Sequence, residues 1–289
     1  MTSCALCEVL ALTYFIEILK SLLFGIVEGI TEWLPISSTG HLILLEEFVK
    51  FDSVSENFSE MFNVVIQLGA ILAVAVIFFG KIWPFSLKEG EVLGIIRRDK
   101  LMLWLKIAVA CLPAAVVGLL FDDLIDEYLY NSVTVGIMLI TVGAAFIAAE
   151  SGKKKAPCVD STELISFTQA LILGVFQLVA AVLPGTSRSG ATILGGLMLG
   201  ISRTAAAEFT FFLGIPVMFG ASLLKLVKFG FDFAATELAI LALGMISAFA
   251  VSMVCIRFLM DYIKRHNFKV FGIYRIVLGA AVLLYFALR

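Results

Sequence analysis

Two related polar stretches interrupt an otherwise hydrophobic chain: GIVEGITEWLPISSTGH at Gly25–His41, the first motif, and GVFQLVAAVLPGTSRSG at Gly174–Gly190, the second motif. At a single offset of 149 residues they share their first glycine and their central proline, and Ser38 aligns with Ser187. Charged and hydroxyl-bearing side chains are costly at membrane depth, so each marks a functional-site hypothesis. Together the motifs predict one site built from the two halves of an internal repeat.

The composition of the chain is that of a membrane protein. Of the 289 residues, 61% are hydrophobic and only 15% are charged, whereas soluble domains carry about 25% charged residues. Several apolar runs approach the roughly 20 residues needed to cross a bilayer. A net charge of −2 without a basic domain gives no indication of a nucleic-acid partner. We therefore predict a polytopic helical membrane protein.

Loop charges predict the orientation of the chain. Lysine and arginine concentrate in three connections, Lys81–Lys106, Lys153–Lys155 and Arg257–Lys269. By the positive-inside rule these connections face the cytoplasm. The acidic segments Glu46–Glu60 and Asp122–Asn131 are then expected on the outside.

Six runs are expected to span the membrane: Phe62–Phe79, Leu101–Phe121, Val133–Ala149, Phe209–Leu224, Leu238–Ile256 and Phe271–Leu288. The two motif-bearing stretches, at about 6–45 and 164–200, would dip in and return to their own side, breaking at Pro35 and Pro184 because proline cannot continue a helix. Such backbone must be buried in protein or line a wet cavity.

The predicted fold is therefore all-α, with six transmembrane helices and two re-entrant helical hairpins in one integral membrane domain, 1–289. An odd number of spans in each half makes the arrangement an inverted-topology repeat. Repeat one covers about 6–149 and repeat two about 164–288. Eight full spans would fit the hydropathy as well.

The first motif carries two glutamates, Glu28 and Glu32, whose spacing of four residues places both carboxyl groups on one face of a helix. Two carboxylates this close in a low dielectric repel each other. Either one takes up a proton and serves as a general base, or a divalent cation such as Mg²⁺ or Ca²⁺ lies between them. A glutamate pair at a helix end and a transporter-type cation site are the alternatives.

Hydroxyl groups follow the proline of the first motif. Ser37, Ser38 and Thr39 come after Pro35, and His41 lies just beyond. A serine becomes a nucleophile when a base lies within hydrogen-bond reach, a role open to His41 or to a glutamate. A helix N-cap is the simpler interpretation, but capping accounts for one hydroxyl, not for three and an imidazole.

Arg188 is the most distinctive residue of the second motif. It lies in PGTSRSGAT, Pro184–Thr192, a turn that opens a helix. Backbone N–H groups, the helix dipole and a guanidinium fork favour a phosphate or a similar oxyanion. Ser187, Ser189 and Thr192 add donors. The alternative is an arginine that snorkels to the cytoplasmic interface.

The two motifs resemble the signature motifs of the bacterial undecaprenyl-diphosphatase family, of the bacitracin-resistance type. FNVVIQLG at Phe62–Gly69 and AEFTFFL at Ala207–Leu213 are also similar to that family, so the resemblance covers nearly the whole chain. It implies a hydrolase of the bacterial plasma membrane that removes the terminal phosphate of undecaprenyl diphosphate, a polyprenyl diphosphate lipid. This reaction regenerates the carrier for peptidoglycan precursors and gives bacitracin resistance.

The resemblance also implies roles for individual residues and an inverted-repeat fold whose site opens to the outer face. Glu28 and Glu32 would be the acidic pair for metal and acid–base work. Ser38 would be the nucleophile, His41 its partner and Arg188 the diphosphate ligand. The remaining phosphate-binding candidates are the hydroxyl residues Ser37, Thr39, Ser187, Ser189 and Thr192. A homodimer is left open as the assembly.

Two alternatives remain at this point. Water could attack the phosphorus directly, with Ser38 only orienting it. The chain could also be a carrier or flippase for a polyprenyl phosphate, because inverted repeats with broken helices are typical of transporters. A transporter would need Arg188 but would have little use for Ser38 beside His41.

Overall fold

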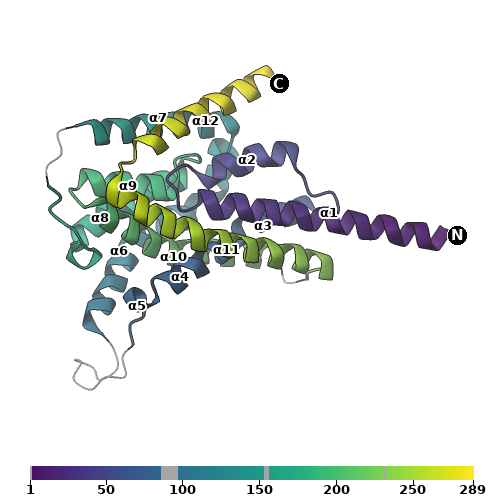
Figure 1. Ribbon diagram of the computed structural model, residues 1–289, viewed down its shortest axis with the longest axis horizontal. Coiled ribbons are helices and arrows are strands. Elements are labelled where there is room, and N and C mark those ends of the chain that lie inside the picture. Colours follow the sequence, from purple (N-terminus) through teal and green to yellow (C-terminus); the bar gives the residue numbers. More distant parts are fainter. Residues whose placement is uncertain (1, 86–96, 153–155, 231) are drawn as a thin grey trace.

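The computed structural model describes residues 2–85, 97–152, 156–230 and 232–289, and these fold into helices without a β-strand (Figure 1). Of the predicted basic connections, Lys88 and Lys153–Lys155 lie outside the described residues. The elements are α1 (Thr2–Thr31), α2 (Ser38–Phe48), α3 (Glu56–Val65), α4 (Gln67–Ile77), α5 (Phe79–Ile82), α6 (Arg98–Leu129), α7 (Ser132–Ser151), η1 (Thr162–Leu164), α8 (Phe167–Val182), α9 (Arg188–Met198), α10 (Arg203–Phe229), α11 (Ala235–Arg265) and α12 (Lys269–Leu288).

Six candidate spans are long and apolar enough to cross a membrane, which confirms the predicted all-α polytopic class. They are Asn57–Ile77, Arg98–Phe121, Ser132–Ser151, Arg203–Phe229, Ala235–Arg265 and Lys269–Leu288. The re-entrant hairpins, the inverted orientation and the proposed repeat boundaries stay predictions.

The predicted starts of two spans, Phe62 and Phe209, were wrong. Ser55 caps α3 by accepting a hydrogen bond from the Phe58 amide at 3.1 Å, so the span begins before the apolar run. Ser202 caps α10 in the same way and starts it ahead of Phe209. The candidate span of α6 ends at Phe121, as predicted. The helix itself continues to Leu129, so most of the acidic segment Asp122–Asn131 is helical.

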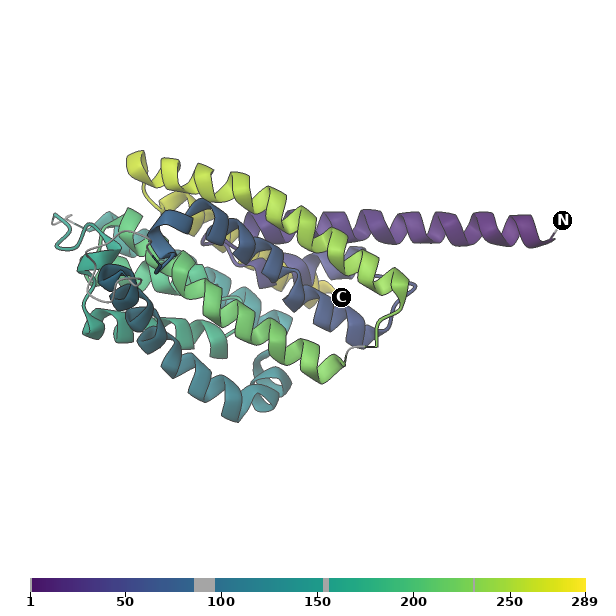
Figure 2. The same cartoon turned by 90° about the horizontal axis from the view of Figure 1, so that it is seen from below.

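Each motif forms a helix–turn–helix, and each turn contains the predicted proline. The first turn joins α1 to α2 and contains Pro35, and the second joins α8 to α9 and contains Pro184. Helix α8 has 16 residues, a length of roughly 24 Å, shorter than the ~30 Å hydrocarbon core of a bilayer. Its length therefore suits a hairpin limb. Helix α1 is longer, and its N-terminal part extends beyond the other helices (Figure 2).

The motif helices pack on spanning helices from the opposite half of the chain. Helix α1 lies along α11, and α8 lies along α6. The glycine that begins each motif faces the partner helix. A Cβ on Gly25 would lie 2.4 Å from the Gly244 carbonyl oxygen, and one on Gly174 would lie 2.4 Å from that of Ala110. Helices α7 and α12, which also come from opposite halves of the chain, pair with each other (Figure 1).

Candidate active site

The helices that follow the two turns begin in the same unusual way. Ser37 caps α2 and has φ 74°, and Ser187 caps α9 and has φ 68°. The Ser37 hydroxyl accepts a hydrogen bond from the Gly40 amide, and the Ser187 hydroxyl accepts one from that of Gly190. A non-glycine residue at positive φ is uncommon and often marks a functional site.

These caps correct the predicted alignment of the two turns. Ser37, not Ser38, corresponds to Ser187, at an offset of 150 residues instead of 149. The second turn has one extra residue after its proline. Consequently Ser38 and Arg188 hold equivalent positions, each the first residue of its helix. The predicted capping role therefore belongs to Ser37, and the Ser38 hydroxyl is free for another partner.

The carboxylate of Glu32 brings Ser38 and Arg188 together. Its Oε2 accepts a hydrogen bond from the Ser38 hydroxyl at 2.8 Å, and its Oε1 accepts one from Nη2 of Arg188 at 2.9 Å. Glu32 is 8% exposed, so this charge pair is largely removed from water. The guanidinium stabilises the negative charge of the carboxylate, and the carboxylate holds the serine hydroxyl. The acid, the hydroxyl and the cation of the two motifs thus form one constellation.

Helix α10 and the first turn hold Arg188 in place. Its Nη1 donates to the Thr210 carbonyl at 2.7 Å, and its guanidinium carbon lies 5.7 Å from the centre of the Trp33 ring. Gly214 leaves room for the guanidinium, because a Cβ there would approach Nη1 to 2.5 Å. These contacts keep the guanidinium inside the protein, which argues against an arginine that snorkels to the cytoplasmic interface.

Two predicted phosphate ligands use their hydroxyl groups within the protein. Ser189 donates to the carbonyl oxygens of Glu32 at 3.1 Å and of Leu34 at 3.3 Å, so it links the two motifs. Thr192 donates to the Arg188 carbonyl at 2.8 Å and lies 2.8 Å from the Thr210 hydroxyl. Both side chains are buried. Their contacts hold the two motifs and α10 together around the site. Direct binding of phosphate by either residue stays a prediction, as it does for Thr39.

His41 lies on the same helix as Ser38, but it contacts Ser37 and Tyr274. Nδ1 is 2.7 Å from the Ser37 carbonyl oxygen, and Nε2 is 2.7 Å from the hydroxyl of Tyr274 on α12. The base in contact with Ser38 is Glu32.

Arg275 also belongs to this region, and the motifs gave no indication of it. It is fully buried on α12 and donates to the carbonyl oxygens of Pro35, Gly185 and Thr186. A signal was present in the sequence, because a single arginine within a predicted span is itself a functional-site hypothesis.

Glu28 is the member of the acidic pair with free oxygens. It is fully buried, and neither carboxylate oxygen has a hydrogen-bond partner in the described part of the chain. Its backbone carbonyl accepts from the Glu32 amide at 3.0 Å, so Glu32, directly after α1, lies one helical turn from Glu28. The described residues contain no group of three or more metal-binding side chains. Because Mg²⁺ is commonly held by one or two carboxylates together with substrate phosphates, this donor set fits such a cation once substrate is bound.

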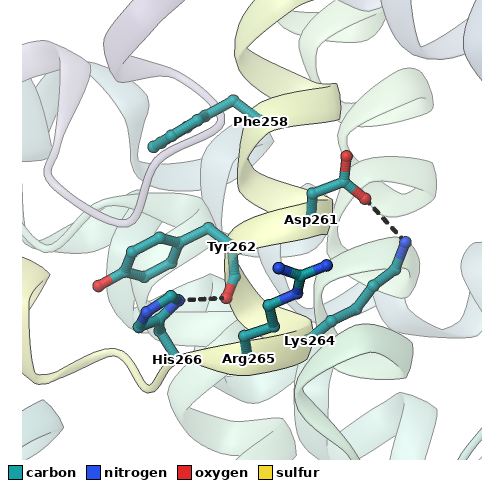
Figure 3. Close-up of a pocket in the computed structure, with 6 residues that line it drawn as sticks. All are labelled: Phe258, Asp261, Tyr262, Lys264, Arg265 and His266. Atoms are coloured by element: carbon teal, nitrogen blue, oxygen red, sulfur yellow. Dashed lines mark hydrogen bonds and ion pairs between the residues drawn. The ribbon is translucent and has the colours of Figure 1, made fainter.

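A separate pocket of about 500 Å³ lies at the C-terminal end of α11 (Figure 3). Its lining residues are Phe258, Asp261, Tyr262, Lys264, Arg265 and His266. None of them belongs to either motif. This pocket is therefore distinct from the constellation around Glu32.

Comparison with known proteins shows relatives along nearly the whole chain. Residues 21–281 match the family described as bacitracin resistance protein BacA. An "Undecaprenyl-diphosphatase 1" of Clostridium acetobutylicum is 59% identical, covering 94% of this chain and 98% of its own length. An "Undecaprenyl-diphosphatase" of Desulfitobacterium hafniense is 57% identical, covering 95% and 98%, and one of Enterococcus faecalis is 59% identical, covering 93% and 97%. With a family match of this extent and relatives of this identity, the chain belongs to the BacA family of bacitracin resistance proteins.

Proposed function

We propose that this protein is a membrane phosphatase that hydrolyses undecaprenyl diphosphate to undecaprenyl phosphate and inorganic phosphate. The names of its relatives supply the substrate. The observation that carries the chemistry is the contact of one carboxylate, Glu32, with both a serine hydroxyl and a guanidinium. Recycling of the lipid carrier for peptidoglycan synthesis, and bacitracin resistance, follow from this reaction.

In the proposed mechanism, Arg188 and the N–H groups that begin α9 bind the diphosphate. Guanidinium groups and helix N-termini both favour phosphate oxygens. The guanidinium of Arg188 would donate hydrogen bonds both to Glu32 and to a phosphate oxygen of the substrate. Phosphoryl transfer depends mostly on positioning and on stabilisation of charge, and the buried constellation supplies both.

Ser38 is the proposed nucleophile. Its Oγ forms a bond to the terminal phosphorus as the bond from that phosphorus to the bridging oxygen breaks, and Glu32 takes the serine proton. The leaving group is undecaprenyl phosphate. Water then attacks the phosphoserine, which releases inorganic phosphate and restores the hydroxyl. Direct attack by water, oriented by Ser38, is the competing pathway.

A divalent cation, Mg²⁺ or Ca²⁺, is proposed as a cofactor. Glu28 would hold it together with Glu32, since both oxygens of Glu28 lack protein partners among the described residues. When bound, such an ion would screen the negative charge of the diphosphate.

The membrane topology adds a location for the site. Six candidate spans make the chain a multi-pass membrane protein. From the loop charges we propose that the site opens to the outer face of the plasma membrane. A homodimer remains a prediction.

Phosphate release from purified undecaprenyl diphosphate in detergent tests the proposal. Detergent micelles have no compartments, so a carrier that only moves the lipid releases no phosphate, whereas a hydrolase does. We expect release that depends on a divalent cation and is lost in Ser38→Ala. Failure of the folded wild-type protein to release phosphate with either Mg²⁺ or Ca²⁺ would exclude the enzyme.

A further inference from the structure

We propose that two adjacent residues of α12, Tyr274 and Arg275, are positioning residues of this active site. Tyr274 orients the imidazole of His41, and Arg275 fixes the turn of the first motif against that of the second. The inference rests on the proposed phosphatase function and adds to it a part of the chain outside both motifs.

Arg275 joins the two turns through one guanidinium group. Nη1 donates to the Pro35 carbonyl at 3.2 Å, and Nη2 donates to the carbonyls of Gly185 and Thr186 at 2.8 Å each. Pro35 belongs to the first motif, and the other two belong to the second. The planar fork of arginine suits such divergent acceptors, whereas a lysine ammonium is a compact point charge. One buried side chain therefore sets the distance between the turns.

The turns joined by Arg275 are the ones that carry backbone strain. Ser37 and Ser187, both at positive φ, come within two residues of the carbonyls that it binds. Strained conformations of this kind persist only where the surrounding structure holds them. Directly after these serines come Ser38 and Arg188. By holding both turns, Arg275 determines where the nucleophile and the phosphate ligand begin their helices.

Arg275 also brings an unpaired positive charge next to the site. In the described part of the chain its hydrogen-bond partners are carbonyl oxygens and none is a carboxylate. The side chain is 0% exposed, and charge interactions are strong in such surroundings. A cation in this position favours the binding of a diphosphate without touching it.

Tyr274, also on α12, contacts His41 of the first motif. The two rings are stacked at 5.6 Å between centroids with an interplanar angle of 5°. Because the Ser37 carbonyl can only accept, Nδ1 of the imidazole carries a proton, and Nε2 of a neutral imidazole then accepts from the Tyr274 hydroxyl. Both ring nitrogens are thus held, so the orientation of the ring is set by Tyr274 on one side and by the strained turn on the other.

Tyr274→Phe tests the first half of the inference, because it removes the hydroxyl but keeps the stacked ring. We expect kcat for phosphate release to fall about tenfold, about 1.4 kcal/mol in activation free energy, with little change in KM. In a His41→Gln background the same change should have no further effect. Tyr285→Phe, on the same helix beside Phe48, is the matched control and should keep wild-type kcat.

Wild-type kcat in Tyr274→Phe would overturn the role of Tyr274, as would a full additional loss in the His41→Gln background. Each of these outcomes presupposes an active wild-type protein. If the wild-type protein releases no phosphate, it is the proposed function that has failed.

Arg275→Lys and Arg275→Gln test the second half. We expect kcat to fall by about 100-fold or more in both, since the guanidinium binds three buried carbonyls whose loss of partners is costly. Lysine should restore part of the diphosphate affinity, seen in KM, but not kcat. A folded Arg275 variant with wild-type kcat and only a lowered Tm would show that the residue merely stabilises the fold.

Gly190→Ala keeps the test decisive should both Arg275 variants fail to fold. A Cβ at Gly190 would lie 3.1 Å from Nη1 of Arg275 and 3.2 Å from Cβ of Ser187, so it presses on the contact between the guanidinium and the second turn without removing either group. A lower kcat at an unchanged Tm supports the inference, and wild-type kcat contradicts it.

Discussion

The Ser38 hydroxyl donates a hydrogen bond to Glu32, with Oγ 2.8 Å from Oε2. The second oxygen of the same carboxylate accepts from Arg188 at 2.9 Å. Glu32 therefore connects a hydroxyl from one motif with a guanidinium from the other. In the proposed mechanism Glu32 therefore takes the proton of Ser38, and His41 is bonded to Ser37 and Tyr274 instead.

Glu32→Gln should lower kcat by about 100-fold or more, because a positioned general base contributes roughly 10²–10⁴-fold and an amide cannot take the serine proton. KM should change as well, since Arg188 loses its ionic partner. The measurement is steady-state phosphate release from the lipid diphosphate in detergent.

Glu17→Gln is a suitable control for that substitution. Glu17 lies on α1, as Glu28 does, is fully buried and forms an ion pair with Lys20 at 2.8 Å. The change should lower stability and leave kcat unaltered. Equal losses of kcat in Glu17→Gln and Glu32→Gln would mean that the loss of a buried charge in this region, and not a missing base, explains the result.

Ser38→Ala should abolish turnover if the serine is the nucleophile, and the wild-type protein should then form a phosphoserine. Rapid acid quenching followed by peptide mass spectrometry would locate the phosphate on Ser38 and not on Ser37, whose hydroxyl caps α2. Substantial turnover in Ser38→Ala would instead assign the attack to water. Ser222→Ala, which removes a hydroxyl bonded to the Val64 carbonyl in another part of the fold, is the control.

The sequence predicted the spans well where apolar length alone defines them. The expected segment Val133–Ala149 became α7, which is only slightly longer. The start of α3 was missed because its first turn is polar and depends on the Ser55 cap, a local hydrogen bond that hydropathy does not register.

The site was predictable to the extent that polar residues stand out against an apolar background. Glu32, Ser38 and Arg188 could be chosen on that ground, but the choice among hydroxyls could not, since composition does not say which serine caps a helix. The extra residue in the second turn was equally hidden. Because the two turns differ in length, only the structure shows that the caps at Ser37 and Ser187 are equivalent.

Glu28→Gln should weaken the response to the divalent cation. If Glu28 holds Mg²⁺ or Ca²⁺ together with the substrate phosphates, the half-activating metal concentration should rise about 10–100-fold, the range seen when groups supporting a metal are removed. The maximal rate at saturating metal should fall less. Metal titrations after treatment with a chelator provide the measurement, with Glu17→Gln as control. An unchanged titration curve would place the cation elsewhere.

Gly214→Ala should damage the site without altering any chemical group. A Cβ at this position of α10 would lie 2.5 Å from Nη1 and 2.8 Å from Nη2 of Arg188, so the guanidinium must move away from Thr210 and Glu32. A displacement of this kind affects both diphosphate binding and the carboxylate that holds Ser38. We expect kcat/KM to fall by about 100-fold, the loss that a misplacement of about 1 Å can cause.

Gly220→Ala separates this effect from a general change in α10. A Cβ at Gly220 would meet no atom within 4 Å, and alanine favours helix over glycine by about 1 kcal/mol. That variant should therefore be at least as stable as the wild-type protein and equally active. If both variants keep wild-type kcat/KM, the position of Arg188 against α10 does not limit the reaction, and the guanidinium must find its productive geometry only after the substrate has bound.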